Sequence, residues 1–264
     1  MLGAILGDAI GSVHQRTKIQ DFDLMTPDSH WTENTIFMLA TADCLLYGGE
    51  YEEVYARWYD WYPKIPRGYN NSFSEWATTN YSKPYYSCRS DGAVRAVPVA
   101  YAFDSLKEVM EEAERSAAVS HNHPDGIKGA QATAAAVFLA KTGAPKETIS
   151  GLLSNIFGYD LQQSYQSLQQ SYQYSALAGD TVGAAILAFL HSNDFEDAVR
   201  KAVALGGDAK TLAAIAGGIA EAFYPKIPPT IRKWGWALLD DGQQDLISEF
   251  QAEFSEDMAH AEAA

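Results

Sequence analysis

Three segments of the chain combine helical spacing with small side chains, and they limit the fold more than any other feature of the sequence. They cover residues 129–139, which are rich in alanine, residues 182–190 and residues 211–224. Helices built from alanine and glycine approach their neighbours closely and suit a buried central position. The sequence contains no comparable set of segments with alternating apolar and polar residues. It therefore predicts an all-α fold of closely packed helices.

Three further segments extend this picture. Residues 31–46 follow a helical pattern, and the hydroxyl of Thr32 is placed to cap the first turn. Residues 195–205 carry one apolar helical face, which the glycines at 206–207 end. Residues 47–86 are rich in aromatic side chains and contain three prolines. This last segment predicts a short helix followed by an irregular loop that overhangs a pocket.

Composition and charge exclude several kinds of partner. A net charge of −15 opposes contact with a phosphate backbone, so nucleic acid is not an expected partner. The two cysteines, Cys44 and Cys88, are too few for a zinc cluster or a disulfide framework, which fits a reducing cytoplasm. The chain has no signal-peptide pattern at its start and no apolar run of about 18 residues, so no membrane partner is expected. We expect a cytoplasmic protein with a single domain over residues 1–264, and its oligomeric state stays open.

Short motifs rich in glycine, alanine and histidine recur in order along most of the chain. In this order and spacing they resemble the ADP-ribosylglycohydrolase family. The resemblance implies an orthogonal multi-helix bundle around a central cleft, two magnesium ions in that cleft, and hydrolysis of a glycosidic bond. The motifs are Gly3, Ala4, Gly7, Asp8 and Gly11; Ala93, Arg95, Val97 and Pro98; His121, Asn122, His123 and Pro124; Gly126, Lys128, Gly129, Ala130, Gln131 and Ala132; and Leu205, Gly206, Gly207 and Asp208, followed by residues 211–217.

Two segments align with the family's metal-binding motifs but differ from them in charge. The family has a threonine followed by two aspartates in the first motif, and two aspartates around one residue, followed by threonine, in the second. Here residues 32–35 read Thr-Glu-Asn-Thr and residues 208–211 read Asp-Ala-Lys-Thr. Asn34 and Lys210 therefore stand where the family has carboxylates, although Mg²⁺ needs oxygen ligands with carboxylate support. We predict no metal and no cofactor, with the Lys210 ammonium in or beside the former metal position.

Other site residues are also assigned by the resemblance. Gln15 aligns with a glutamate that acts in the family's hydrolytic mechanism; an amide cannot accept that proton, although it can hydrogen-bond a substrate hydroxyl. Arg89, Ser90 and Asp91 align with the family's glycine-rich phosphate loop. Arg89 would attract a diphosphate, whereas Asp91 would oppose one.

The remaining acids give the candidates for catalysis. Glu33 and Asp208 lie beside Lys210 in the aligned site, and either acid could activate water or act only as a salt-bridge partner of Lys210. Asn34, His123, Asp180 and Thr211 complete the predicted substrate-binding set. The alternative to substrate binding is a structural role: His123 would belong to a turn, and Asp180 would cap a helix.

Three functions remain open at this point. The first is a divergent hydrolase that binds a nucleotide-like, ribosyl or related anionic small molecule and cleaves it without magnesium. In that reading Glu33 or Asp208 activates water, Lys210 stabilises negative charge or orients the carboxylates, and Arg89 meets a phosphate. The second is an inactive binding or scaffold protein, which the loss of a carboxylate at Gln15 favours. The third is ordinary magnesium-dependent removal of ADP-ribose from a protein side chain.

Overall fold

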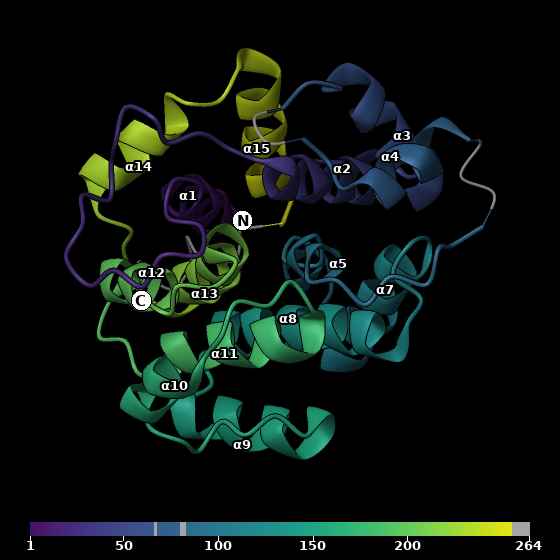
Figure 1. Ribbon diagram of the computed structural model, residues 1–264. Helices are drawn as coiled ribbons and strands as arrows, with labels where there is room; N and C mark the ends of the chain where they lie inside the picture. The colour runs from purple at the N-terminus through teal and green to yellow at the C-terminus, as the bar shows by residue number, and fades with distance from the viewer. Residues whose placement is uncertain (66–67, 80–82, 255–264) are drawn as a thin grey trace, which may run out of the picture.

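The computed structural model describes residues 1–65, 68–79 and 83–254. Helices joined by loops account for the architecture of these residues (Figure 1), and an isolated β-bridge pairs Arg89 with Leu177. The predicted all-α class is therefore confirmed. The helices are α1 (Leu2–Gly11), α2 (Glu33–Tyr47), α3 (Tyr51–Trp61), α4 (Asn71–Thr78), α5 (Asp91–Val94), α6 (Val99–Ala102), α7 (Leu106–Ala118), α8 (Pro124–Lys141), α9 (Lys146–Phe157), α10 (Tyr165–Ser171), α11 (Ala178–Leu190), α12 (Phe195–Ala204), α13 (Ala209–Phe223), α14 (Pro229–Trp236) and α15 (Asp241–Phe254).

Helices α1 and α13, which are distant in the sequence, pack closely against each other. The glycines of α1 face α13, and their lack of a side chain permits this approach. A Cβ atom added at Gly7 would lie 2.0 Å from the carbonyl oxygen of Ala213, and one added at Gly11 would lie 2.4 Å from that of Ala209. No real side chain fits at these distances, so the α1–α13 pair requires glycine at both positions.

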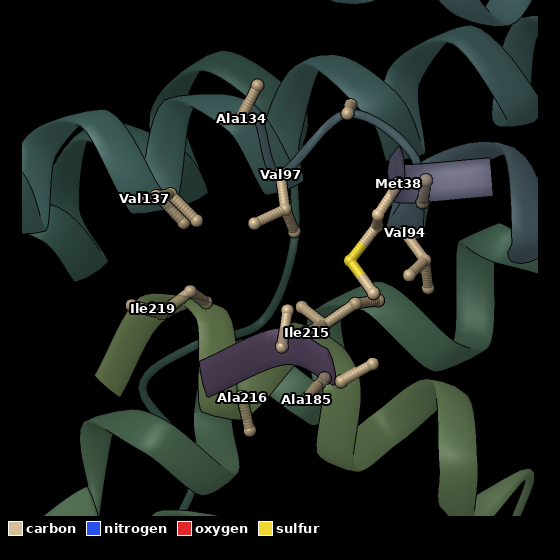
Figure 2. Close-up of a cluster of buried hydrophobic side chains, with 14 of the residues drawn as sticks. Met38, Val94, Val97, Ala134, Val137, Ala185, Ile215, Ala216 and Ile219 are labelled. Carbon is tan, nitrogen blue, oxygen red and sulfur yellow. The ribbon is translucent and has the colours of Figure 1, made fainter. Parts of the chain in front are cut away.

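The small-residue helices α8, α11 and α13 meet at the centre of the molecule. Figure 2 shows Val137 of α8, Ala185 of α11 and Ile215 of α13 around Val97, and all four side chains are fully buried. Alanine at the contact points lets these helices pack closely, as the composition of the three segments predicted. This core forms the support on which the ends of α1, α2 and α13 are placed.

The predicted helical segments overlap observed helices, with one correction to where a helix begins and one to the number of helices. Thr32 caps α2 as expected, because its hydroxyl accepts a hydrogen bond from the backbone N–H of Asn34 at 3.3 Å. Helix α11 begins at Ala178, earlier than predicted, so Asp180 lies inside the first turn and does not precede the helix. The described residues of the aromatic segment 47–86 form two helices after residue 47, α3 and α4, where one was predicted.

The helices at the two ends of Figure 1 lie far from each other. Helices α2, α3, α4 and α15 form one end of the view, and α9 forms the other. Among the described residues, no helix is both long and apolar enough to cross a membrane.

Candidate functional site

A cavity of about 500 Å³ opens where several chain segments from different parts of the sequence meet. These segments are the loop after α1, the first turn of α2, the loop before α4, the loop before α5, the loop before α11 and the start of α13. The cavity is lined by Gln15, Arg16, Glu33, Gly68, Tyr69, Asn70, Arg89, Tyr174, Asp208 and Lys210.

The buried carboxylate of Asp8 joins α1 to the start of α2. It accepts hydrogen bonds from the backbone N–H of Thr32 at 2.8 Å, from the Thr32 hydroxyl at 2.6 Å and from the Thr35 hydroxyl at 2.7 Å. Burial raises the pKa of Asp8, although the Lys210 ammonium and the two threonine hydroxyls oppose that rise. Asp8 therefore holds the helix ends that form the cavity floor, while its own side chain does not line the cavity.

The side chain of Asn34 continues this network toward α13. Its Nδ2 atom donates to Asp8 at 3.3 Å and to the hydroxyl of Thr211 at 3.1 Å. Asn34 and Thr211 are both buried, so neither side chain lines the cavity. Both residues connect the helices beneath the site.

Glu33 of α2 and Lys210 of α13 form an ion pair across the cavity wall. Only 12% of the Glu33 side chain and 13% of the Lys210 side chain are exposed, so the pair is largely shielded from water. Burial alone would lower the pKa of Lys210, but the carboxylates of Glu33, Asp208 and Asp8 outweigh burial and raise it. Lys210 is therefore a cation at neutral pH. Of the two pairings predicted for it, the structure contains the one with Glu33.

Asp208 and Gln15 lie next to this ion pair. The Asp208 residue is 6% exposed, and burial raises the pKa of its carboxyl against the opposing effect of Lys210. The Gln15 amide, oriented with its nitrogen toward Asp208, donates to that carboxylate at 3.0 Å. In this orientation its oxygen accepts from the backbone N–H of Lys210 at 2.9 Å. Gln15 therefore fixes the Asp208 carboxylate relative to the start of α13.

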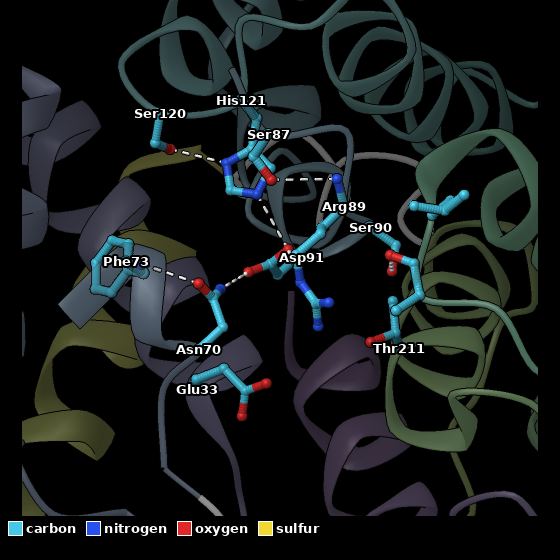
Figure 3. A network of polar contacts seen from close by, with 12 residues as sticks. Glu33, Asn70, Phe73, Ser87, Arg89, Ser90, Asp91, Ser120, His121 and Thr211 are labelled. Carbon is cyan, nitrogen blue, oxygen red and sulfur yellow. Dashed lines mark hydrogen bonds and ion pairs between the residues drawn. The ribbon is translucent and has the colours of Figure 1, made fainter. Parts of the chain in front are cut away.

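A second polar network supports the opposite wall of the cavity (Figure 3). At its centre Asp91 accepts from Asn70 at 2.9 Å, contacts Nε2 of His121 at 3.0 Å and lies 3.7 Å from the guanidinium of Arg89. Burial alone would raise the pKa of Asp91, but contacts with His121, Arg89 and Arg95 hold it well below the ordinary value. Asp91 therefore stays ionised, and its charge is balanced within the protein by the guanidinium groups of Arg89 and Arg95.

The protonation state of His121 follows from its neighbours. Arg95 can only donate, and its Nη2 atom lies 3.1 Å from Nδ1 of His121, so Nδ1 must be the acceptor. The ring proton is then on Nε2 and faces Asp91. Burial lowers the pKa of His121, which agrees with a neutral imidazole. This ring holds Asp91 in place, and Asp91 in turn orients Asn70 and Arg89 at the cavity.

The structure brings together five of the residues predicted from sequence as site residues and leaves six outside the cavity lining. Gln15, Glu33, Arg89, Asp208 and Lys210 line the cavity. The side chains of Asn34, Ser90, Asp91 and Thr211 are buried beneath it. His123 caps α8 by accepting from the backbone N–H of Asp125 at 3.1 Å, and Asp180 accepts from the hydroxyl of Ser175 at 2.7 Å.

Four lining side chains were not predicted. Tyr69 and Asn70 belong to the segment that was expected to overhang a pocket. The sequence therefore indicated the segment but not these two residues. The Arg16 guanidinium lies 4.3 Å from the centre of the Tyr174 ring. Arg16 has a φ of 63°, an uncommon backbone conformation for a residue with a side chain. Nothing in the local sequence pattern indicates that Arg16 and Tyr174 are in contact.

The lining combines three basic side chains with two acidic ones, in a protein whose net charge is −15. The basic residues Arg16, Arg89 and Lys210 favour an anionic ligand, and two carboxyls lie beside the space that it would occupy. Within the described part of the chain, no three His, Cys, Asp or Glu side chains gather as the ligands of a metal ion would.

Comparison with known proteins gives consistent results. The family model for ADP-ribosylglycohydrolase matches residues 1–261. The chain is 26% identical to the ADP-ribosylarginine hydrolase Tri1 of Pseudomonas putida (strain GB-1), over 90% of this chain and 73% of that protein. It is 23% identical to the ADP-ribosylhydrolase ARH3 of Gallus gallus, over 87% of this chain and 86% of that protein. A solved structure titled ADP-ribosylglycohydrolase-related protein complex superposes with a TM-score of 0.65 at 25% identity, covering 93% of this chain and 94% of that one.

Proposed function

Because the chain belongs to the ADP-ribosylglycohydrolase family, we propose that its cavity binds a nucleotide-like or ribosyl anion and hydrolyses a glycosidic bond without a magnesium pair. The observation that carries this proposal is the shielded ion pair of Glu33 and Lys210 beside the buried Asp208. It places an ammonium and two carboxyl groups at one end of a cavity that is otherwise lined by polar side chains.

The side chains at this end do not fit a pair of magnesium ions. Magnesium requires near-octahedral oxygen ligation, with carboxylates that are free to bind it. Here the Glu33 carboxylate is already paired with the Lys210 ammonium, and Asn34 directs its NH₂ group toward Asp8 and Thr211. Donor groups therefore occupy positions where the metal would need acceptors.

The two carboxyls suit different steps of glycosidic hydrolysis. Burial raises the pKa of Asp208, so this group retains a proton to higher pH and can protonate the leaving group. Glu33, fixed by its ion pair with Lys210, is the candidate base that takes a proton from the attacking water. In this assignment Lys210 orients the base, and Gln15 positions the acid through its hydrogen bond.

The basic residues of the cavity provide the contacts for the anion. The guanidinium of Arg89 is tethered by Asp91, while its side chain remains 44% exposed and can reach a phosphate or carboxylate. Arg16 lies on the cavity wall beside the aromatic ring of Tyr174. We therefore assign the anionic part of the ligand to Arg16 and Arg89 and the scissile bond to the end formed by Glu33, Asp208 and Lys210.

A non-catalytic binding protein is the second candidate function. The observation that favours it is the amide at Gln15, because both of its polar atoms are used within the protein and neither can act as a base. Such a protein would keep the anion-binding wall and lack turnover.

The test compares binding and turnover with and without magnesium. Binding is measured by the rise in melting temperature with ADP-ribose, in EDTA and in magnesium chloride, because a ligand of the folded state stabilises it by mass action. Turnover is measured as release of ADP-ribose from an ADP-ribosylarginine conjugate. We expect stabilisation and turnover to be equal in the two buffers. Stabilisation without turnover would support the binding protein, and magnesium-dependent turnover would contradict the proposed chemistry.

A further inference from the structure

Trp61, the last residue of α3, separates two cavities that lie away from the proposed active site. The first has a volume of about 470 Å³ and lies between α2, α3 and α15. The second has a volume of about 520 Å³ and lies between α3 and the end of α4. Trp61 and Arg57 line both cavities, and 58% of Trp61 is exposed. The indole is therefore accessible to a partner that occupies either cavity.

Carboxylates outnumber basic groups around these two cavities. The guanidinium of Arg57 is the single basic group among the described lining residues, and it pairs with the buried Asp43 at 3.1 Å. The other carboxylates belong to exposed residues and form no ion pair with any described residue. They are Asp245 and Glu249 in the first cavity and Glu53 and Asp60 in the second.

The aromatic side chains of the first cavity are arranged to receive a cation. The guanidinium of Arg57 already lies 5.5 Å from the centre of the Trp61 ring, so the ring takes part in a cation–π contact within the protein itself. Trp58 and Tyr62 stack on each other at 5.6 Å and extend the aromatic lining behind it. The alkyl stem of an arginine or lysine can pack on such rings while its charged head meets the carboxylates at the rim.

We propose that this surface, formed by Trp61 and its two flanking cavities, binds a basic segment of a partner protein. One arginine or lysine of the segment enters each cavity, and the backbone between them crosses Trp61. The four exposed carboxylates supply the opposite charge. The proposal does not depend on the activity of the anion-binding cavity, because none of that cavity's lining residues lines this surface.

Fluorescence anisotropy with the full-length protein tests the proposal. The probe is a fluorescein-labelled peptide of alternating arginine and glycine residues, and a peptide of alternating glutamate and glycine is the comparison. We expect saturable binding of the basic peptide only. Trp61→Ala should weaken it about fivefold to tenfold, which is the effect of losing a cation–π contact with partial desolvation. Since Trp61 is largely exposed, its truncation leaves the core intact, and circular dichroism verifies this.

A matched pair of charge variants separates this surface from general attraction to an acidic protein. Asp245→Asn with Glu249→Gln should weaken binding about fivefold to tenfold, because two rim charges are lost. Glu147→Gln with Asp160→Asn removes the same charge at exposed residues near α9, at the opposite end of the molecule, and should change the dissociation constant less than about twofold. Equal effects of the two double variants, an unchanged affinity in Trp61→Ala, or no binding of the basic peptide would each overturn the proposal.

Discussion

The ammonium group of Lys210 is the cation that balances the carboxylates of the proposed active site. It is the basic partner of Glu33 and lowers the pKa of Asp8 and Asp208, both of which burial raises. Lys210→Met keeps much of the side-chain volume and leaves these carboxyls without their cation. We expect a loss of about 3 kcal/mol in the free energy of unfolding in urea at neutral pH, the cost of breaking a buried pair. Lys107→Met is the control, because Lys107 is 82% exposed and its pair with Glu111 should contribute less than about 1 kcal/mol.

The pH dependence of this loss has a definite sign. Without Lys210, the folded-state pKa values of Asp8 and Asp208 rise further above the unfolded value of 3.8. The folded variant then binds more protons than the unfolded chain over a wider pH range, so its stability falls as pH rises through that range. The destabilisation by Lys210→Met should be larger near pH 7 than near pH 5. A difference of the opposite sign between urea titrations at the two pH values would argue against the assigned role of Lys210.

At the scale of single elements, the packing of α1 on α13 sets the position of the site. Gln15 lies in the loop after α1, and Lys210 lies in the first turn of α13. Gly7→Ala places a methyl group against the backbone of Ala213, so α1 must shift. We expect a loss of about 3 kcal/mol in the free energy of unfolding, at the upper end for overpacking. Gly151→Ala in α9 is the matched control. A Cβ atom there meets nothing within 4 Å, and the change should stabilise the protein by about 0.5 to 1 kcal/mol. Thermal and urea denaturation of the two variants would show whether the effects differ in sign.

Several of the helices could be predicted from the sequence, whereas the contacts between their ends could not. Helical spacing and glycine breakers gave α2, α8, α12 and α13, because each pattern is local. Two of the partners of Asp91, Asn70 and His121, come from distant segments of the chain. The sequence therefore could not show that the Asp91 carboxylate contacts them as well as Arg89. The contact of Arg16 with Tyr174 joins two loops without periodic signal. The family resemblance implied a central cleft. Which of the aligned side chains line a cavity and which are buried could be read only from the three-dimensional structure.

At the scale of the whole molecule, the net charge of −15 destabilises the folded state, because like charges repel one another across its surface. Salt screens this repulsion, with a Debye length of about 10 Å at 0.1 M. The melting temperature at neutral pH should therefore rise when sodium chloride is increased from about 0.05 M to about 0.5 M. Near the isoelectric point of about 4.7 the same change in salt should have little effect. Differential scanning calorimetry at the two pH values measures both responses. A melting temperature that falls with salt at neutral pH would mean that attractive ion pairs dominate.

The close contact of α1 with α13 also has a consequence for the order in which the protein becomes functional. The glycines of α1 can pack only after the ribosome has produced α13, which follows much later in the chain, whereas neighbours such as α7 and α8 can associate early. Closing so long a loop is entropically costly, so docking of α1 is expected among the late events of folding. The end of the cavity that is built from the segments after α1 and at the start of α13, the proposed catalytic end, would then form last. Intermediates on the ribosome would already possess most of their helices and yet have no working site.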